Sequence, residues 1–184
     1  VIGNLKQNTL EEIWHGEEAE NIRKAFLGGE LIGCNEQYCP ECINNSTTLY
    51  LEEEELRQMY ENLPEIPLQI SLAYDERCNH ACPSCRKEFF SAGKEYRQEL
   101  VTITKNIEPY LPKVKHIATN GIGDLFVSHE LLDMLSRFHP CDPDMTMFIE
   151  TNGVLFKQNW DKMKHLAGHI ETVSITPNSF DRET

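Results

Sequence analysis

The sequence predicts an α/β fold in which parallel strands alternate with helices. Short β-rich runs occur at residues 68–74, 114–118, 145–150 and 172–175, and helical stretches separate them. Strands that are separated by helices are joined by right-handed crossovers and form a parallel sheet, as in an α/β barrel or a doubly wound fold. Because four strands do not close a barrel, we expect a partial (β/α) barrel whose sheet is incomplete in this chain.

Three helical stretches are expected to connect these strands. The first covers about residues 87–108, although Gly93 weakens it. The second begins after Ser128, a good N-cap, and runs to about residue 139. The third covers residues 156–166.

The chain before the first strand divides into two further units. A capping box at residues 9–12 and a second helical pattern at residues 17–26 predict a small, mostly helical N-terminal segment. A polar helix is expected at residues 46–63, and prolines mark its boundary with the first strand. The expected units are a Cys-containing helical segment (1–45), a helical linker (46–67) and the beginning of an α/β domain (68–184).

Composition narrows the class of partner. The 184 residues include 30 Asp and Glu against 17 Lys and Arg, a formal charge of −13. A chain this acidic repels phosphate backbones and anionic lipids, so we expect neither nucleic acid nor membrane as a partner. No apolar run approaches the roughly 18 residues of a membrane span, and the N-terminus lacks a signal-peptide pattern. The absence of an early Met suggests a piece of a longer protein, which we expect to be cytoplasmic.

The seven cysteines are the most informative residues. Six of them form two tight triplets, and Cys141 stands alone and is expected to be a small buried hydrophobe. An odd number without an export signal argues against a disulfide scaffold. In a reducing compartment, thiols grouped this closely indicate metal or cluster ligands. The two triplets are Cys34, Cys39 and Cys42, and Cys78, Cys82 and Cys85.

Unusual residues follow each predicted strand. In parallel α/β folds, the loops after the carboxyl ends of the strands form the ligand-binding edge. The second triplet follows the first strand, and an Asn-Gly turn follows the third. We therefore expect a composite site at this edge. Its candidate residues are Cys78, Cys82, Cys85, Gly121, Gly123, Asp124, Asn152 and Ser174.

The second triplet has the spacing Cys-x3-Cys-x2-Cys. Three thiolates on one loop can bind three irons of an iron–sulfur cube and leave the fourth iron open to a substrate or cofactor. A zinc site is the alternative, but zinc needs a fourth ligand. His80 could supply it, or Cys82 and Cys85 could share a four-cysteine site with Cys39 and Cys42, across a stretch that is long for a zinc ribbon.

This loop resembles the cluster loop of the radical SAM superfamily. It reads Cys78-Asn-His-Ala-Cys82-Pro-Ser-Cys85 directly after a strand, and Gly121-Ile-Gly123-Asp124 falls where that family has a Gly-Gly-Glu-type motif. Residues 151–153 and 173–175 fall at the third and fourth strands, where the family contacts ribose and carboxylate groups. The resemblance covers about residues 68–180 and implies a partial radical SAM barrel.

The upstream triplet belongs to a second resemblance. Residues 3–5 and 10–14, Arg23 and the three upstream cysteines look like the tail of a SPASM-type auxiliary cluster domain. Such domains accompany peptide-modifying radical SAM enzymes and usually follow the core, whereas here the order is reversed. The resemblance implies a second 4Fe–4S cluster that Cys34, Cys39 and Cys42 would hold in part. A structural zinc is the alternative.

Together these resemblances imply a radical SAM enzyme. Such an enzyme cleaves S-adenosylmethionine (SAM) reductively at a 4Fe–4S cluster, and the 5′-deoxyadenosyl radical abstracts hydrogen from a peptide or other organic substrate. An electron donor such as flavodoxin or ferredoxin is implied as a partner. The implied roles are cluster ligands for Cys78, Cys82 and Cys85, contacts to the methionine ammonium for Gly121, Gly123 and Asp124, and ribose or carboxylate contacts for Asn152 and Ser174.

A function from another class stays open. The incomplete sheet, and Asp124 where the family's motif more commonly has Glu, are also consistent with a non-catalytic iron–sulfur or zinc-binding interaction module. The sequence identifies no residue that touches the substrate, so it gives neither the substrate nor a catalytic side chain.

Overall fold

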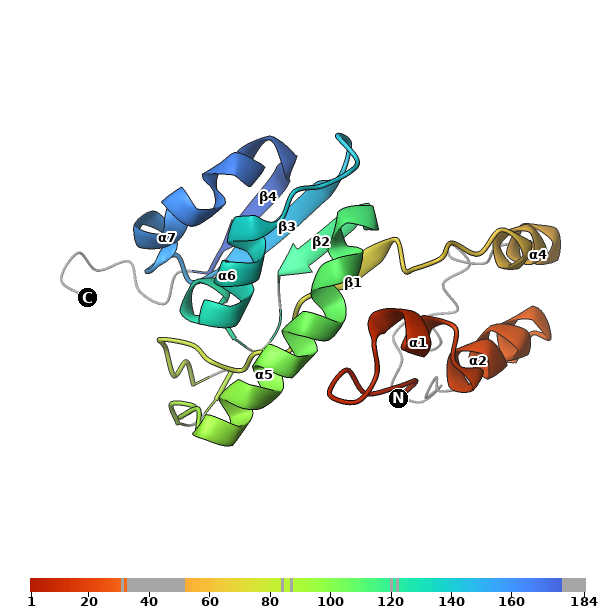
Figure 1. Ribbon diagram of the computed structural model, residues 1–184, viewed down its shortest axis with the longest axis horizontal. Coiled ribbons are helices and arrows are strands. Elements are labelled where there is room, and N and C mark those ends of the chain that lie inside the picture. The colour runs from red at the N-terminus through yellow and green to blue at the C-terminus, as the bar shows by residue number, and fades with distance from the viewer. Residues whose placement is uncertain are drawn as a thin grey trace.

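A four-stranded parallel sheet forms the centre of the protein (Figure 1). The computed structural model describes residues 1–30, 32, 52–83, 85, 86, 88–119, 121 and 123–176. The strands lie in the order β1-β2-β3-β4, and every neighbouring pair is parallel. They are β1 (Gln69–Ser71), β2 (His116–Thr119), β3 (Thr146–Thr151) and β4 (Ile170–Ile175). The predicted α/β class with parallel strands is therefore confirmed.

Three helices cover one face of this sheet (Figure 1): α5 (Lys94–Ile107), α6 (His129–Arg137) and α7 (Phe156–Met163). Alternate residues of β2 and β3 are buried, as the two-residue period of a strand requires. Among them, Ile117 and Met147 belong to one core cluster with apolar residues of the helices. Short 3-10 helices complete the connections, at Glu108–Lys113, Leu125–Val127 and Lys164–His169.

The other face of the sheet is less covered. Phe148, Glu150 and Ser174 point to it and are only half-buried, and Thr172, the partner of Phe148 in the β3–β4 register, is exposed. Glu150 and Ser174 are register partners near the carboxyl end of the sheet. A sheet with helices on one face and an open second face is consistent with part of a (β/α) barrel.

The first connecting helix is shorter than predicted. α5 begins at Lys94, with Gly93 as its N-cap, so the prediction of helix from residue 87 is wrong over the described residues 88–92. Glycine is unfavourable inside a helix but acceptable at an N-cap, and here it marks the start. Ser128 caps α6 as predicted, with its hydroxyl accepting from the Leu131 amide.

The N-terminal unit contains α1 (Leu10–Trp14) and α2 (Glu17–Leu27), and the linker contains α4 (Glu53–Glu61). The predicted capping box before α1 is present. The unit is attached to the rest of the chain by polar contacts: the Trp14 indole donates to the Pro64 carbonyl (2.8 Å), and the Asn106 amide of α5 donates to the Leu5 carbonyl (2.8 Å).

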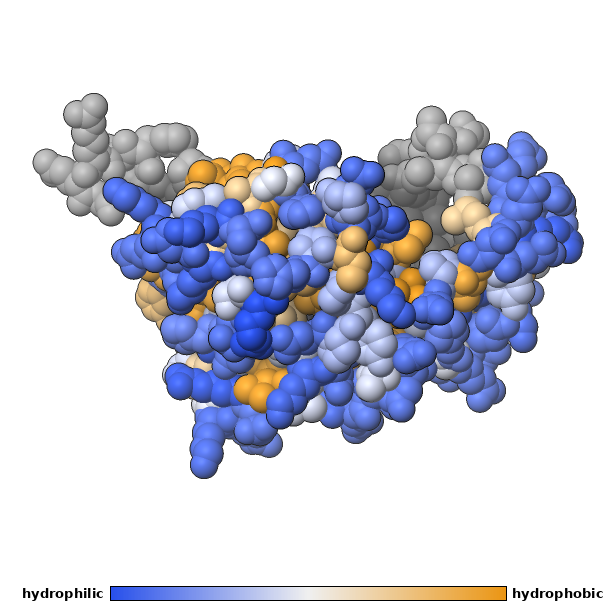
Figure 2. All heavy atoms as spheres, turned by 45° about the horizontal axis from the view of Figure 1, so that its top comes forward, coloured by the Kyte–Doolittle hydropathy of each residue, from blue (hydrophilic) through white to orange (hydrophobic). Residues whose placement is uncertain are grey.

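The visible surface in Figure 2 is mainly hydrophilic, as the acidic composition leads one to expect. Hydrophobic residues appear there as separate patches. Among the helices of the described residues, none is both long and apolar enough to cross a membrane.

Candidate functional site

A cavity of about 210 Å³ lies at the carboxyl edge of the sheet. The loops after β1 and β2, the end of β3 and the residue after β4 all contribute to it, as expected for a ligand-binding edge. Its lining residues are Cys78, His80, Cys82, Cys85, Arg86, Gly121, Gly123, Asp124, Glu150, Thr151, Asn152 and Thr176.

The cavity brings together most of the residues that the sequence singled out. Every candidate residue after β1, β2 and β3 lines it. Ser174 does not; it lies within β4, opposite Glu150 in the register. The predicted auxiliary ligands Cys34, Cys39 and Cys42 lie outside the described residues. The composite site thus forms from loops that are far apart in the sequence.

The cysteine loop forms a tight turn within this cavity. The amides of Cys85 and Arg86 both donate to the Cys82 carbonyl (2.9 Å each). Cys78 and Cys82 are half-buried, and Cys85 is exposed. In the described parts of the chain, no three His, Cys, Asp or Glu side chains are grouped closely enough to hold a metal ion. Three thiols on one loop are the right donors for an iron–sulfur cluster, but joint ligation requires their sulfurs to come closer together.

Two glycines allow the β2 loop to lie directly against the β1 loop. A Cβ atom on Gly123 would lie 2.0 Å from the Asp75 carbonyl oxygen and 2.8 Å from that of Arg77. A Cβ atom on Gly121, which has φ of 122°, would lie 2.7 Å from the Cβ of Ala73. Only glycine permits this backbone and this spacing. The structure therefore gives these glycines a role in loop packing that the sequence did not reveal.

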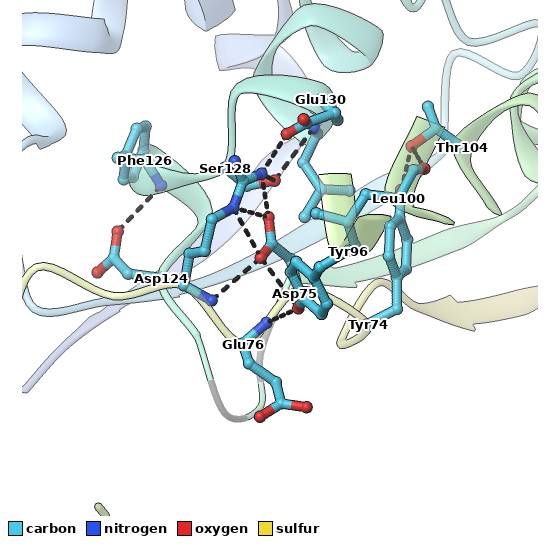
Figure 3. A network of polar contacts seen from close by, with 12 residues as sticks. Tyr74, Asp75, Glu76, Tyr96, Leu100, Thr104, Asp124, Phe126, Ser128 and Glu130 are labelled. Atoms are coloured by element: carbon cyan, nitrogen blue, oxygen red, sulfur yellow. Dashed lines mark hydrogen bonds and ion pairs between the residues drawn. The ribbon is translucent and has the colours of Figure 1, made fainter. Parts of the chain in front are cut away.

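Asp124 connects the β2 loop to β3. Its buried carboxylate accepts from the Phe126 amide through Oδ1 (2.9 Å), and through Oδ2 from the Thr151 hydroxyl (2.8 Å) and the Asn152 amide (2.9 Å). Figure 3 shows the Oδ1 contact. A carboxylate offers about four acceptor positions, so most of them are already used within the protein. The predicted contact of Asp124 with a methionine ammonium stays a prediction.

A buried ionic network, which sequence reasoning missed, fixes the residue before Cys78. The Arg77 guanidinium pairs with Asp75 (Nε to Oδ2, 2.9 Å) and with Glu130 at the start of α6, and it also donates to Ser128 Oγ (3.3 Å). Figure 3 shows Asp75, Ser128 and Glu130 converging from the β1 loop and α6. Only the Asp-x-Arg-Cys order hinted at a pair, and nothing in the sequence identified Glu130.

The electrostatics of this network stabilise the charged forms of both partners. Burial raises the pKa of Asp75, but hydrogen bonds from Arg77 and Ser128 outweigh burial and hold that pKa below its usual value. Burial likewise lowers the pKa of Arg77, but hydrogen bonds to Asp75 and Glu130 raise it overall. Both groups are therefore ionised at neutral pH.

The isolated cysteine differs from its prediction. Cys141 is exposed rather than buried. It lies in the turn after α6, between Pro140 and Asp142, where its backbone amide donates to the Pro112 carbonyl (3.1 Å). At this position the backbone amide contacts the rest of the fold, while the cysteine side chain is exposed.

Comparison with known proteins gives two matches. Residues 1–43 match the SPASM family, described as an iron–sulfur cluster-binding domain. Two curated relatives, both named FeMo cofactor biosynthesis protein NifB, are 27% identical (Methanocaldococcus jannaschii) and 25% identical (Methanocaldococcus infernus) over 125 residues. Each alignment covers 62% of this chain and 41% of the relative, so the chain spans less than half of their length. No solved structure matches the chain.

The SPASM match covers the N-terminal helical unit, and the NifB proteins form a radical SAM family. Both kinds of relative indicate iron–sulfur clusters. With the parallel α/β sheet beside them, these matches support a protein of the radical SAM/SPASM type.

Proposed function

We propose that this chain is the part of a radical SAM enzyme that binds a 4Fe–4S cluster through Cys78, Cys82 and Cys85. The observation that supports this most is the shared cavity, because these three thiols line it together with Asp124 and Asn152 from two other loops. A loop of thiols beside polar groups suits a cluster that has one open iron and a polar ligand next to it.

The donor types present, three thiols on one loop, fit this role once their sulfurs come together. When bound, such a cluster supplies the electron that splits the sulfonium of SAM into methionine and a 5′-deoxyadenosyl radical, which takes a hydrogen atom from the substrate. Donor groups already face two of these sulfurs: the His80 amide donates to the Cys78 sulfur (3.4 Å), and the Arg86 guanidinium lies 4.0 Å from the Cys85 sulfur. Asp124 keeps acceptor capacity for an ammonium group.

The substrate is proposed at the level of class. The SPASM match of residues 1–43 supports a peptide or other organic substrate and a second cluster on the upstream triplet. The likeness to proteins named for FeMo cofactor biosynthesis favours a second candidate, a role in assembling a metal cofactor. In either case a flavodoxin or ferredoxin would supply electrons in the cytoplasm, where thiols stay reduced.

Anaerobic reconstitution tests the proposal. We expect the chain to take up iron and acid-labile sulfide, and Cys82→Ala to lose the share that the Cys78 loop binds, because a cluster lacking a thiolate ligand is not retained. Cys141→Ala is the matched control, since this cysteine is exposed and lies outside the cavity; its iron content should equal that of the wild type. Release of 5′-deoxyadenosine from SAM under dithionite then reports on cleavage.

The possible outcomes separate the alternatives. Uptake of zinc without sulfide would exclude both the radical SAM enzyme and the non-catalytic iron–sulfur module. Iron and sulfide that are insensitive to Cys82→Ala would exclude the Cys78 loop as the site. Iron and sulfide on this loop without release of 5′-deoxyadenosine would favour a non-catalytic iron–sulfur module.

A further inference from the structure

The side chain of Asn152 reaches the first cysteine of the loop. Its Nδ2 donates to the Cys78 sulfur (3.6 Å) and to Asn79 Oδ1 (2.7 Å). The backbone amide of His80 donates to the same sulfur (3.4 Å). The Cys78 sulfur therefore receives two N–H donors, one of them from a different strand end.

The orientation of this side-chain amide is fixed by its surroundings. Asn152 Oδ1 accepts from the Val154 amide (3.0 Å), which can only donate, so the oxygen must face that amide. The nitrogen then points to Cys78. The backbone amide of Asn152 donates to Asp124 Oδ2 (2.9 Å), which anchors the residue at the end of β3.

These contacts close a ring that runs through three loops. Asp124 donates its own amide to the Arg77 carbonyl (2.9 Å), and Arg77 directly precedes Cys78. One contact joins Arg77 to Asp124, and a second joins Asp124 to Asn152. A third runs from Asn152 to the sulfur of Cys78, which lies on the same loop as Arg77. The distance from Asn152 to this sulfur is thus set by groups on both sides of it.

We propose that Asn152 is a positioning residue whose amide donates to the Cys78 sulfur and raises the reduction potential of a cluster bound there. N–H donors at a ligating sulfur stabilise the more negative, reduced cluster, and such hydrogen bonds are one of the factors that set cluster potentials. The inference rests on the proposed function for the cluster itself. It gives Asn152 a task distinct from the ribose or carboxylate contact that the sequence resemblance implies.

Two substitutions isolate the donor. Asn152→Asp keeps the shape and the acceptor for Val154 but puts a negative oxygen toward the sulfur, and Asn152→Leu removes the polar group altogether. We expect the midpoint potential of the reconstituted cluster, measured by spectroelectrochemistry, to fall in Asn152→Leu and to fall further in Asn152→Asp. Asn106→Leu, which removes a side-chain amide that donates to Leu5, is the matched control and should leave the potential unchanged.

A second readout needs no cluster. In the iron-free chain, the alkylation of Cys78 by iodoacetamide is followed by peptide mass spectrometry, with Cys85 as the internal reference. Because Asn152 Nδ2 donates to the Cys78 sulfur, its removal in Asn152→Leu should change the alkylation of Cys78 relative to Cys85 by about threefold, the range expected for a net hydrogen bond. Asn106→Leu should keep the wild-type ratio.

The failures are distinguishable. If the wild type holds a cluster and both Asn152 variants keep its potential, the inference is overturned and the proposed function stands. If the wild type takes up no iron, the proposed function fails together with the claim about potential, and the alkylation ratio still decides whether Asn152 donates to Cys78. An unchanged ratio overturns that contact.

Discussion

Arg77→Leu is expected to lower the free energy of unfolding by about 3 to 5 kcal/mol. The substitution removes the shared cation and leaves the carboxylates of Asp75 and Glu130 without it, and these side chains are only 2% and 17% exposed. A charge that stays buried without its partner is among the most destabilising changes in a protein. For a chain of this size the loss corresponds to a fall in melting temperature of about 10 °C, measurable by circular dichroism.

Arg57→Leu is the matched control. Arg57 pairs with Glu53 within α4, but both side chains are well exposed, at 58% and 72%. Such an exposed pair contributes little to stability, because solvent screens it. A loss in Arg77→Leu as small as that in Arg57→Leu would show that the buried network does not hold the fold together.

Acid should reduce the difference between the wild type and Arg77→Leu. Because the folded protein holds the pKa of Asp75 below its usual value, the stability this residue contributes is complete above the unfolded pKa and is lost as the pH falls through the folded pKa. The unfolded pKa is about 3.9. Unfolding free energies measured by urea titration should therefore converge below about pH 4, where protonation removes the charge that Arg77 compensates.

Gly123→Ala is expected to destabilise the chain by about 3 kcal/mol and to lower its iron content after reconstitution. The added methyl would lie 2.0 Å from the Asp75 carbonyl oxygen, and backbone atoms cannot move aside as a flexible side chain can. The β1 and β2 loops must separate, which breaks the contact between the Asp124 amide and the Arg77 carbonyl. Asp124 then moves with its loop, away from the cavity that it shares with the cysteines.

Gly168→Ala controls for the substitution itself. Gly168 lies in the 3-10 helix Lys164–His169, and a Cβ atom there would have nothing within 4 Å. We expect its unfolding free energy and iron content to match those of the wild type. Equal behaviour of the two alanine variants would contradict the tight packing of the β1 and β2 loops.

The sequence was a good guide to the sheet because local patterns determine it. The run at residues 145–150 is within one residue of β3, since the two-residue alternation that creates a half-buried strand is visible in the letters. The ends of the helices were harder to predict. Gly93 is the N-cap of α5, but the sequence alone does not show whether the residues before it continue the helix or make contacts elsewhere.

The candidate site was predicted in part for the same reason. The cysteine spacing and the glycines of the β2 loop are local signals, and the cavity includes them. The partner of Arg77 on α6 is not a local signal: Glu130 lies 53 residues away in the sequence and looks like any surface charge of a helix. The same holds for Asn152, whose contact with Cys78 depends on how the ends of two strands are placed.

The parallel arrangement of the strands also determines how the cavity can form during folding. Neighbouring strands pair residues such as Gln69 with His116 and His116 with Thr146, so each pairing must close a long stretch of chain before it gains any hydrogen bonds. Two antiparallel strands joined by a short hairpin turn can pair by themselves. These parallel strands cannot, because a long connection separates each strand from its neighbour. We therefore expect the cysteine loop to stay unformed in the nascent chain until the segment that contains β3 has been synthesised, and metal insertion to follow folding rather than to precede it.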